Sequence, residues 1–86
     1  YKGVPTLIVE VLSPATLSKD LVKKTELYLQ TGVREYWTVE PDVKTVCQYI
    51  FADKDIADYR VYIGDSAIQS ACFPGLAVRL NELFLT

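Results

Sequence analysis

An almost continuous apolar run near the start of the chain has one carboxylate in its middle. The run reads Leu-Ile-Val-Glu-Val-Leu-Ser over residues 7–13. Its richness in Ile and Val predicts a β-strand that is covered on both faces. An ionised carboxylate is costly in such a strand, so Glu10 needs a cation, a set of hydrogen bonds or an open cleft beside it. The residues alone leave an alternative, in which Glu10 faces solvent at a sheet edge or pairs with one lysine.

The next segment has the spacing of an amphipathic helix. Pro14 ends the first strand because it has no N–H to donate, and Thr16 or Ser18 offers a helix N-cap. The predicted helix extends to about Gln30. Residues spaced three and four apart lie on one of its sides: Leu21, Thr25, Tyr28 and Leu29. Gly32 is expected to end the helix.

Three polar side chains follow one another along this helix. Asp20, Lys24 and Tyr28 are four residues apart, so they lie on one stripe of the helix surface. Lys24 could therefore project over the end of the preceding strand. The alternative is an exposed Asp20–Lys24 pair, which would contribute only a few tenths of a kcal/mol.

The remainder of the chain predicts mostly strands. Residues 34–40 are rich in aromatic and β-branched types and predict a strand parallel to the first, with Trp37 in the core. Pro41 and Asp42 predict a turn, and residues 45–51 an antiparallel partner strand. The charged residues 52–58 are expected to form a solvated loop, because they lack the Gly and terminal Glu of a calcium loop.

The last part of the chain predicts more sheet and no evident catalytic arrangement. Strands are expected over residues 59–63, 67–72 and 76–80, followed by a brief helical turn over residues 82–85 that Asn81 caps. The predicted fold class is therefore α/β or α+β, with a mixed sheet flanked by helices and a β-rich C-terminal half.

Composition and charge narrow the picture. The 86 residues are enough for a single domain. Because the chain begins at Tyr1 and contains no Met, we expect residues 1–86 to be an internal or C-terminal piece of a longer protein. The net charge of −2 excludes a general attraction for a phosphate backbone, so any nucleic-acid role must rest on a local site.

Cysteine spacing and hydropathy argue against a zinc site and a membrane-spanning helix. Cys47 and Cys72 have no zinc spacing and the chain has no His, so both are expected to be buried free thiols of a cytoplasmic protein. No stretch approaches the roughly 18 consecutive apolar residues of a membrane helix, and there is no signal-peptide pattern.

Several separated blocks of the sequence resemble one protein family. They are, in order, residues 9–14, the Asp20–Lys24–Tyr28 stripe, residues 32–37 with Glu40-Pro41, residues 73–76 and residues 80–84. Over nearly the whole chain these blocks resemble the Uma-type family of bacterial endonucleases, a branch of the PD-(D/E)xK nuclease superfamily.

The resemblance implies a restriction-endonuclease-like fold that hydrolyses DNA with Mg²⁺, or with Mn²⁺ in its place. Residues 1–86 would be the C-terminal part of such a nuclease-like domain, and Glu10 would be a metal ligand together with an acid upstream of Tyr1. In the superfamily a lysine usually lies two positions after the second metal-binding acid, which would be Glu10 here. That position holds Leu12, and in this branch a helix lysine is thought to replace the missing one. Lys24 would then position or activate the attacking water, and Asp20 would orient Lys24.

One departure from the family supports a second hypothesis. Thr6 stands where the family often carries Asp; this position is roughly 13 Å from Glu10 along an extended strand, too far to share a metal. With the acidic pI and the apolar strands, this substitution favours an inactive nuclease fold that serves as a dimerising or partner-binding module. We expect a homodimer in either case, while a plain structural domain remains a third possibility.

Overall fold

The computed structural model describes residues 3–12, 19–64 and 66–83, and the side chains of all of these except residues 19, 20 and 83. A four-stranded mixed sheet has the order β1 (Leu7–Val11), β2 (Glu35–Glu40), β3 (Thr45–Ala52) and β4 (Asp55–Ile63). β1 runs parallel to β2, and the other neighbours are antiparallel. This arrangement confirms the predicted mixed sheet and the parallel pairing across the helix.

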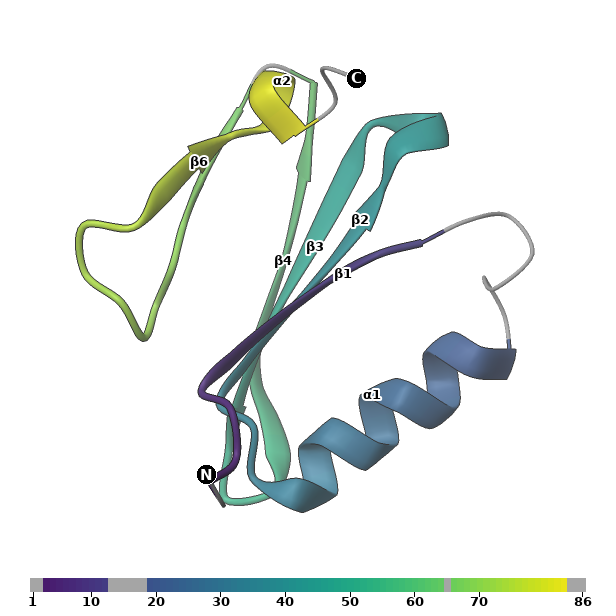
Figure 1. The fold of residues 1–86 in the computed structure, drawn as a ribbon, viewed down its shortest axis with the longest axis vertical. Coiled ribbons are helices and arrows are strands. Elements are labelled where there is room, and N and C mark those ends of the chain that lie inside the picture. Colours follow the sequence, from purple (N-terminus) through teal and green to yellow (C-terminus); the bar gives the residue numbers. More distant parts are fainter. Residues whose placement is uncertain (1–2, 13–18, 65, 84–86) are drawn as a thin grey trace.

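Two layers cover opposite faces of the sheet (Figure 1). The helix α1 (Lys19–Thr31) lies on one face. The other face carries a hairpin of β5 (Ala67–Gln69) and β6 (Ala77–Arg79), followed by α2 (Leu80–Leu83). Because side chains alternate along a strand, β2 contributes to both layers. Tyr36 packs toward α1, and Trp37, which is 2% exposed as expected of a core residue, packs toward the hairpin.

The helix α1 ends where the sequence predicts. Gly32 has a φ of 96°, a left-handed conformation that glycine adopts at low cost. The N–H of Val33 donates to the carbonyl oxygen of Tyr28 at 3.1 Å, as in a Schellman motif. All four residues predicted to lie on one side of the helix are partly buried: Leu21, Thr25, Tyr28 and Leu29. The expected N-caps Thr16 and Ser18 lie outside the described residues.

The expectation that the first strand is covered on both faces is wrong for the described residues. β1 lies at an outer position of the sheet, and Val9 and Val11 are 46% and 70% exposed. The cause is the placement of the hairpin layer, whose core packs against β2 and β3. Leu7 is the described β1 residue that reaches this core.

The predicted charged loop over residues 52–58 is also wrong. β3 and β4 are joined by Asp53 and Lys54 alone, with φ of 54° and 59°. Two left-handed residues match the twist of a hairpin, which lets β4 begin directly at Asp55. The β4 strand is therefore nine residues long, with a bulge opposite Ile50 and Phe51.

Smaller differences concern the C-terminal half. β5 ends at Gln69 instead of continuing to residue 72, and α2 begins at Leu80, two residues before the expected turn. Cys47 and Cys72 are free, as predicted, but both are partly exposed instead of buried.

A buried glutamate joins the sheet to the hairpin layer. Glu35 is fully buried, and its carboxylate accepts hydrogen bonds over 2.6–3.2 Å from three side chains and two backbone N–H groups, of Trp37, Gln48, Ser70, Ala71 and Cys72. Burial alone would raise the pKa of Glu35, but the bonds from Gln48, Ser70 and Trp37 outweigh it and lower the pKa to about 2. The ionised carboxylate therefore stabilises the fold.

We expect Glu35→Gln to lower the free energy of unfolding by about 3–5 kcal/mol, because the amide nitrogen would face donors that lose their acceptor. Urea unfolding at neutral pH measures this loss. In the parent chain the folded pKa of Glu35, about 2, lies below the ordinary value of 4.5. The stabilisation by Glu35 should thus be complete above pH 4.5 and lost as the pH falls toward 2.

The matched control is Glu26→Gln, because Glu26 is exposed on α1. It should leave both the unfolding free energy and its acid dependence near those of the parent. A Glu35→Gln chain as stable as the Glu26→Gln chain would contradict the structural role of the buried carboxylate.

Candidate active site at Glu10

Glu10 lies in β1 and points to the face of the sheet that α1 covers. Its side chain is 18% exposed and meets two donors from α1. The Nζ of Lys24 lies 3.1 Å from Oε2, and the hydroxyl of Tyr28 donates to Oε1 at 2.7 Å. Lys24 and Tyr28 are one helical turn apart, so the stripe seen in the sequence faces the carboxylate. The structure therefore brings Glu10 and Lys24 together.

The third predicted site residue, Asp20, lies in the first turn of α1, one turn before Lys24. Its side chain is outside the described part of the chain. The expected pairing of Asp20 with Lys24 thus stays a prediction.

Tyr28 is a residue of the candidate site for which the sequence analysis predicts no role. Its hydrogen bond to Glu10, together with burial and the carboxylate charge, raises the pKa of Tyr28 above its usual value. The ring packs edge-on against Tyr36, with centroids 5.0 Å apart. In the sequence, Tyr28 lies on the same helical stripe as Asp20 and Lys24. This spacing placed Tyr28 near the site but did not predict its hydrogen bond to Glu10.

Tyr36 lies beneath this site with its hydroxyl group unused. The residue is fully buried, and its hydroxyl has no hydrogen-bond partner among the residues that the structure describes. Burial and the nearby charge of Glu10 raise the pKa of Tyr36, so this phenol stays neutral. Its ring belongs to the core beneath the site and packs against the ring of Tyr28.

The carboxylate oxygens of Glu10 are ligands of the type that a hard divalent cation prefers. However, the described residues contain no group of three or more His, Cys, Asp or Glu side chains that could hold a metal ion. Glu10 thus fits such an ion by ligand type, but the described residues do not complete a metal site around it.

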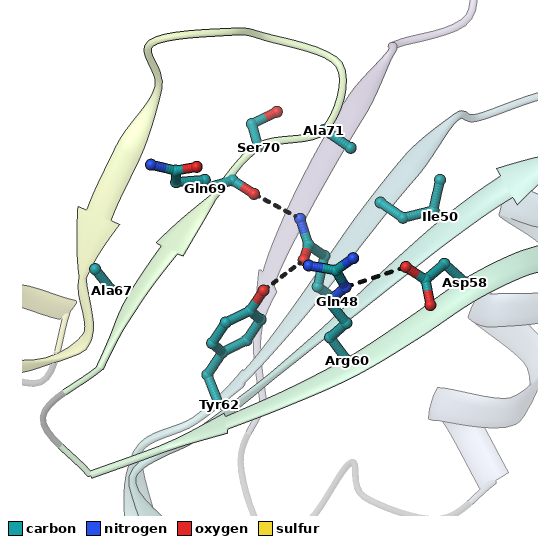
Figure 2. Close-up of a pocket in the computed structure, with 9 residues that line it drawn as sticks. All are labelled: Gln48, Ile50, Asp58, Arg60, Tyr62, Ala67, Gln69, Ser70 and Ala71. Atoms are coloured by element: carbon teal, nitrogen blue, oxygen red, sulfur yellow. Dashed lines mark hydrogen bonds and ion pairs between the residues drawn. The ribbon is translucent and has the colours of Figure 1, made fainter.

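A separate hollow of about 430 Å³ lies between β3, β4 and β5 (Figure 2). Its polar groups are largely paired with one another. Gln48 donates to the carbonyl oxygen of Gln69 and accepts from the hydroxyl of Tyr62, while Arg60 pairs with Asp58 at 3.1 Å. This hollow is on the face opposite Glu10, so it does not extend the candidate site.

Comparison with known proteins agrees with this fold. The model of the Uma2 family, described as "Putative restriction endonuclease", matches residues 1–81. The chain belongs to the Uma2 family. Its membership and the nuclease-like fold confirm the resemblance seen in the sequence. Restriction-endonuclease-like proteins in general use divalent metal ions.

One solved structure supports the same fold. It is the crystal structure of a "putative nuclease belonging to DUF820" from Anabaena variabilis, with a TM-score of 0.68 and 27% sequence identity. The match covers 92% of this Uma2-family chain and 43% of that protein, so the chain spans less than half of its neighbour's length. A search of curated proteins returned no match. None of the helices in the described residues is both long and apolar enough to cross a membrane.

We expect Glu10→Ala to fold, with an unfolding free energy within about 2 kcal/mol of the parent, because the lost bonds are offset by removal of a partly buried charge. Thermal and urea unfolding measure this. The expected loss is smaller than for Glu35→Gln. Lys24 is 49% exposed, and an ion pair with an exposed partner contributes only about 0–1 kcal/mol to stability. Global unfolding of Glu10→Ala would show that Glu10 is a structural residue.

Proposed function

We propose that this chain is the C-terminal part of a magnesium-dependent endonuclease domain of the cytoplasm that hydrolyses the phosphodiester bonds of DNA. Mn²⁺ would be able to replace Mg²⁺. The observation that carries the proposal is the Glu10–Lys24 contact, a carboxylate and an ammonium held 3.1 Å apart in a chain of an endonuclease family.

Glu10 is suited to be a metal ligand because its backbone is fixed in a sheet. β1 pairs with β2 along its whole length, with Glu10 opposite Thr38. The carboxylate therefore projects from a rigid element, as a ligand that must be positioned within a fraction of an ångström requires. When bound, the metal ion supplies charge neutralisation at the phosphate and a lowered pKa of its bound water.

Lys24 is suited to act on the reacting groups. Its side chain is 49% exposed, and its ammonium sits at the carboxylate on a flexible four-carbon stem. It can therefore reach a phosphate oxygen or a water beside Glu10 and stabilise the negative charge that develops there. Asp20, one turn earlier on α1, would orient Lys24 through an i, i+4 pair.

The second acidic ligand is proposed to come from a strand upstream of Tyr1. Two observations support this. β1 has no neighbour on its outer side among the described residues. The structural neighbour is more than twice as long as the part matched here, which leaves room for such a strand.

The test is a titration of the full-length protein with Mg²⁺ or Mn²⁺ that follows metal affinity and plasmid cleavage in parallel. Glu10→Ala should lose both, because it removes a ligand. Lys24→Ala should keep metal binding and lose cleavage by about 100- to 1,000-fold, the size typical of one charge-stabilising donor.

Lys23→Ala is the matched control, because Lys23 is an exposed neighbour on α1 that lies off the stripe. It should cleave as the parent does. A full-length parent that neither binds metal nor cleaves DNA would contradict the enzyme and favour the second candidate function.

That second candidate is an inactive nuclease fold acting as a dimerising or partner-binding module. The outer strand β4 supports it, since three apolar or aromatic side chains on one face, Tyr59, Val61 and Ile63, are 48%, 52% and 64% exposed. A nine-residue outer strand of this kind offers an edge for pairing with a second copy. The homodimer is compatible with the enzyme as well.

If the dimer forms through β4, Val61→Lys should convert it to a monomer by placing a charge in a buried interface. Light scattering coupled to size-exclusion chromatography measures the mass. Val22→Lys on α1 is the control, because Val22 is 70% exposed on another element. A monomeric parent, or a Val61→Lys chain that stays dimeric, would contradict this interface.

A further inference from the structure

The two donors on Glu10 occupy different oxygens. The hydroxyl of Tyr28 donates to Oε1 at 2.7 Å, and the ammonium of Lys24 contacts Oε2 at 3.1 Å. A hydroxyl that donates to a carboxylate at this distance belongs to the stronger class of hydrogen bonds. Each oxygen of the carboxylate thus has its own donor.

The two donors also differ in how firmly they are held. The ring of Tyr28 is packed edge-on against Tyr36, beside a cluster that includes Val33 and Phe51. Its backbone carbonyl lies at the fixed C-terminal end of α1, where it accepts from the N–H of Val33. Lys24, by contrast, has a half-exposed side chain, and an exposed ion pair of this kind is worth about 0–1 kcal/mol. Lys24 is therefore the more easily displaced of the two donors.

We propose that Tyr28 is a positioning residue, which fixes Oε1 of Glu10 so that Oε2 is the oxygen presented to a divalent cation. This inference rests on the proposed function of Glu10 as a metal ligand. Lys24 would give up its contact with Oε2 when a cation binds Glu10, and its ammonium would then be free to face the substrate. Tyr28 and Lys24 touch one carboxylate, yet they act on metal affinity in opposite directions.

The experiment measures Mn²⁺ affinity of the full-length protein by calorimetry without DNA. Tyr28→Phe keeps the ring and removes the hydroxyl, and it should weaken binding about 10- to 100-fold, as loss of a residue that orients a metal ligand does. Lys24→Met should strengthen binding by up to about five-fold, because it removes the competitor for Oε2.

Two controls separate positioning from other effects. Tyr36→Phe removes the neighbouring buried hydroxyl, which has no partner among the described residues, and should leave the affinity within about two-fold. Lys23→Met makes the same charge change off the stripe, and should raise the affinity less than Lys24→Met does. Thermal unfolding of each variant without metal reports any structural damage separately.

Each outcome decides the matter. A Tyr28→Phe chain that melts earlier but binds Mn²⁺ like the parent would make Tyr28 purely structural and overturn the inference. If Tyr28→Phe does not fold, Lys24→Met still decides, since weaker binding there would refute exchange at Oε2. Glu10→Gln provides the distinction from the proposed function: undiminished Mn²⁺ binding in that variant would overturn the metal site itself.

Discussion

The buried carboxylate of Glu35 is the contact on which the two-layered structure depends. A hairpin as small as β5–β6 has little stability of its own, and the Glu35 carboxylate binds the side chain of Ser70 and the backbone N–H of Cys72 in the segment that follows β5. Because β2 alternates its side chains, Glu35 and Trp37 hold the hairpin while Tyr36 supports α1 on the other face. The strand that anchors both layers is also the parallel partner of β1, so it fixes the position of Glu10.

Local signals in the sequence accounted for much of the fold. Gly32 marked the end of α1, the periodic positions of α1 gave its buried side, and the apolar runs gave the strands. The failures concern information that lies outside a short window. The exposure of Val9 and Val11 depends on where a distant hairpin packs, and the charged residues after Ala52 concealed a two-residue turn. Charge composition favoured a loop there, but the twist of the paired strands determined the backbone.

The candidate site likewise combines features set by local spacing with features set by long-range packing. Regular helical spacing placed Lys24 and Tyr28 on one stripe, and a short crossover brought that stripe to Glu10. The hydrogen bond of Tyr28 to one oxygen could not be foreseen, since it depends on the depth at which α1 packs against Tyr36. Glu35 carried no recognisable signal, because its donors come from residues up to 37 positions away. Two glutamates in adjacent strands thus have different surroundings: Glu35 is buried with five donors, and Glu10 is held partly by a half-exposed lysine.

These separations along the chain also bear on the order of folding. The contacts of Glu10 span 14 and 18 residues, whereas those from Glu35 to the segment after β5 span 35 to 37. Each doubling of a closed loop adds about 0.6 kcal/mol of entropic cost, so the shorter loops close first. We therefore expect the contacts of α1 with Glu10 to form before the hairpin encloses Glu35. The candidate site at Glu10 would then take shape before the hairpin of β5 and β6 closes over the other face of the sheet.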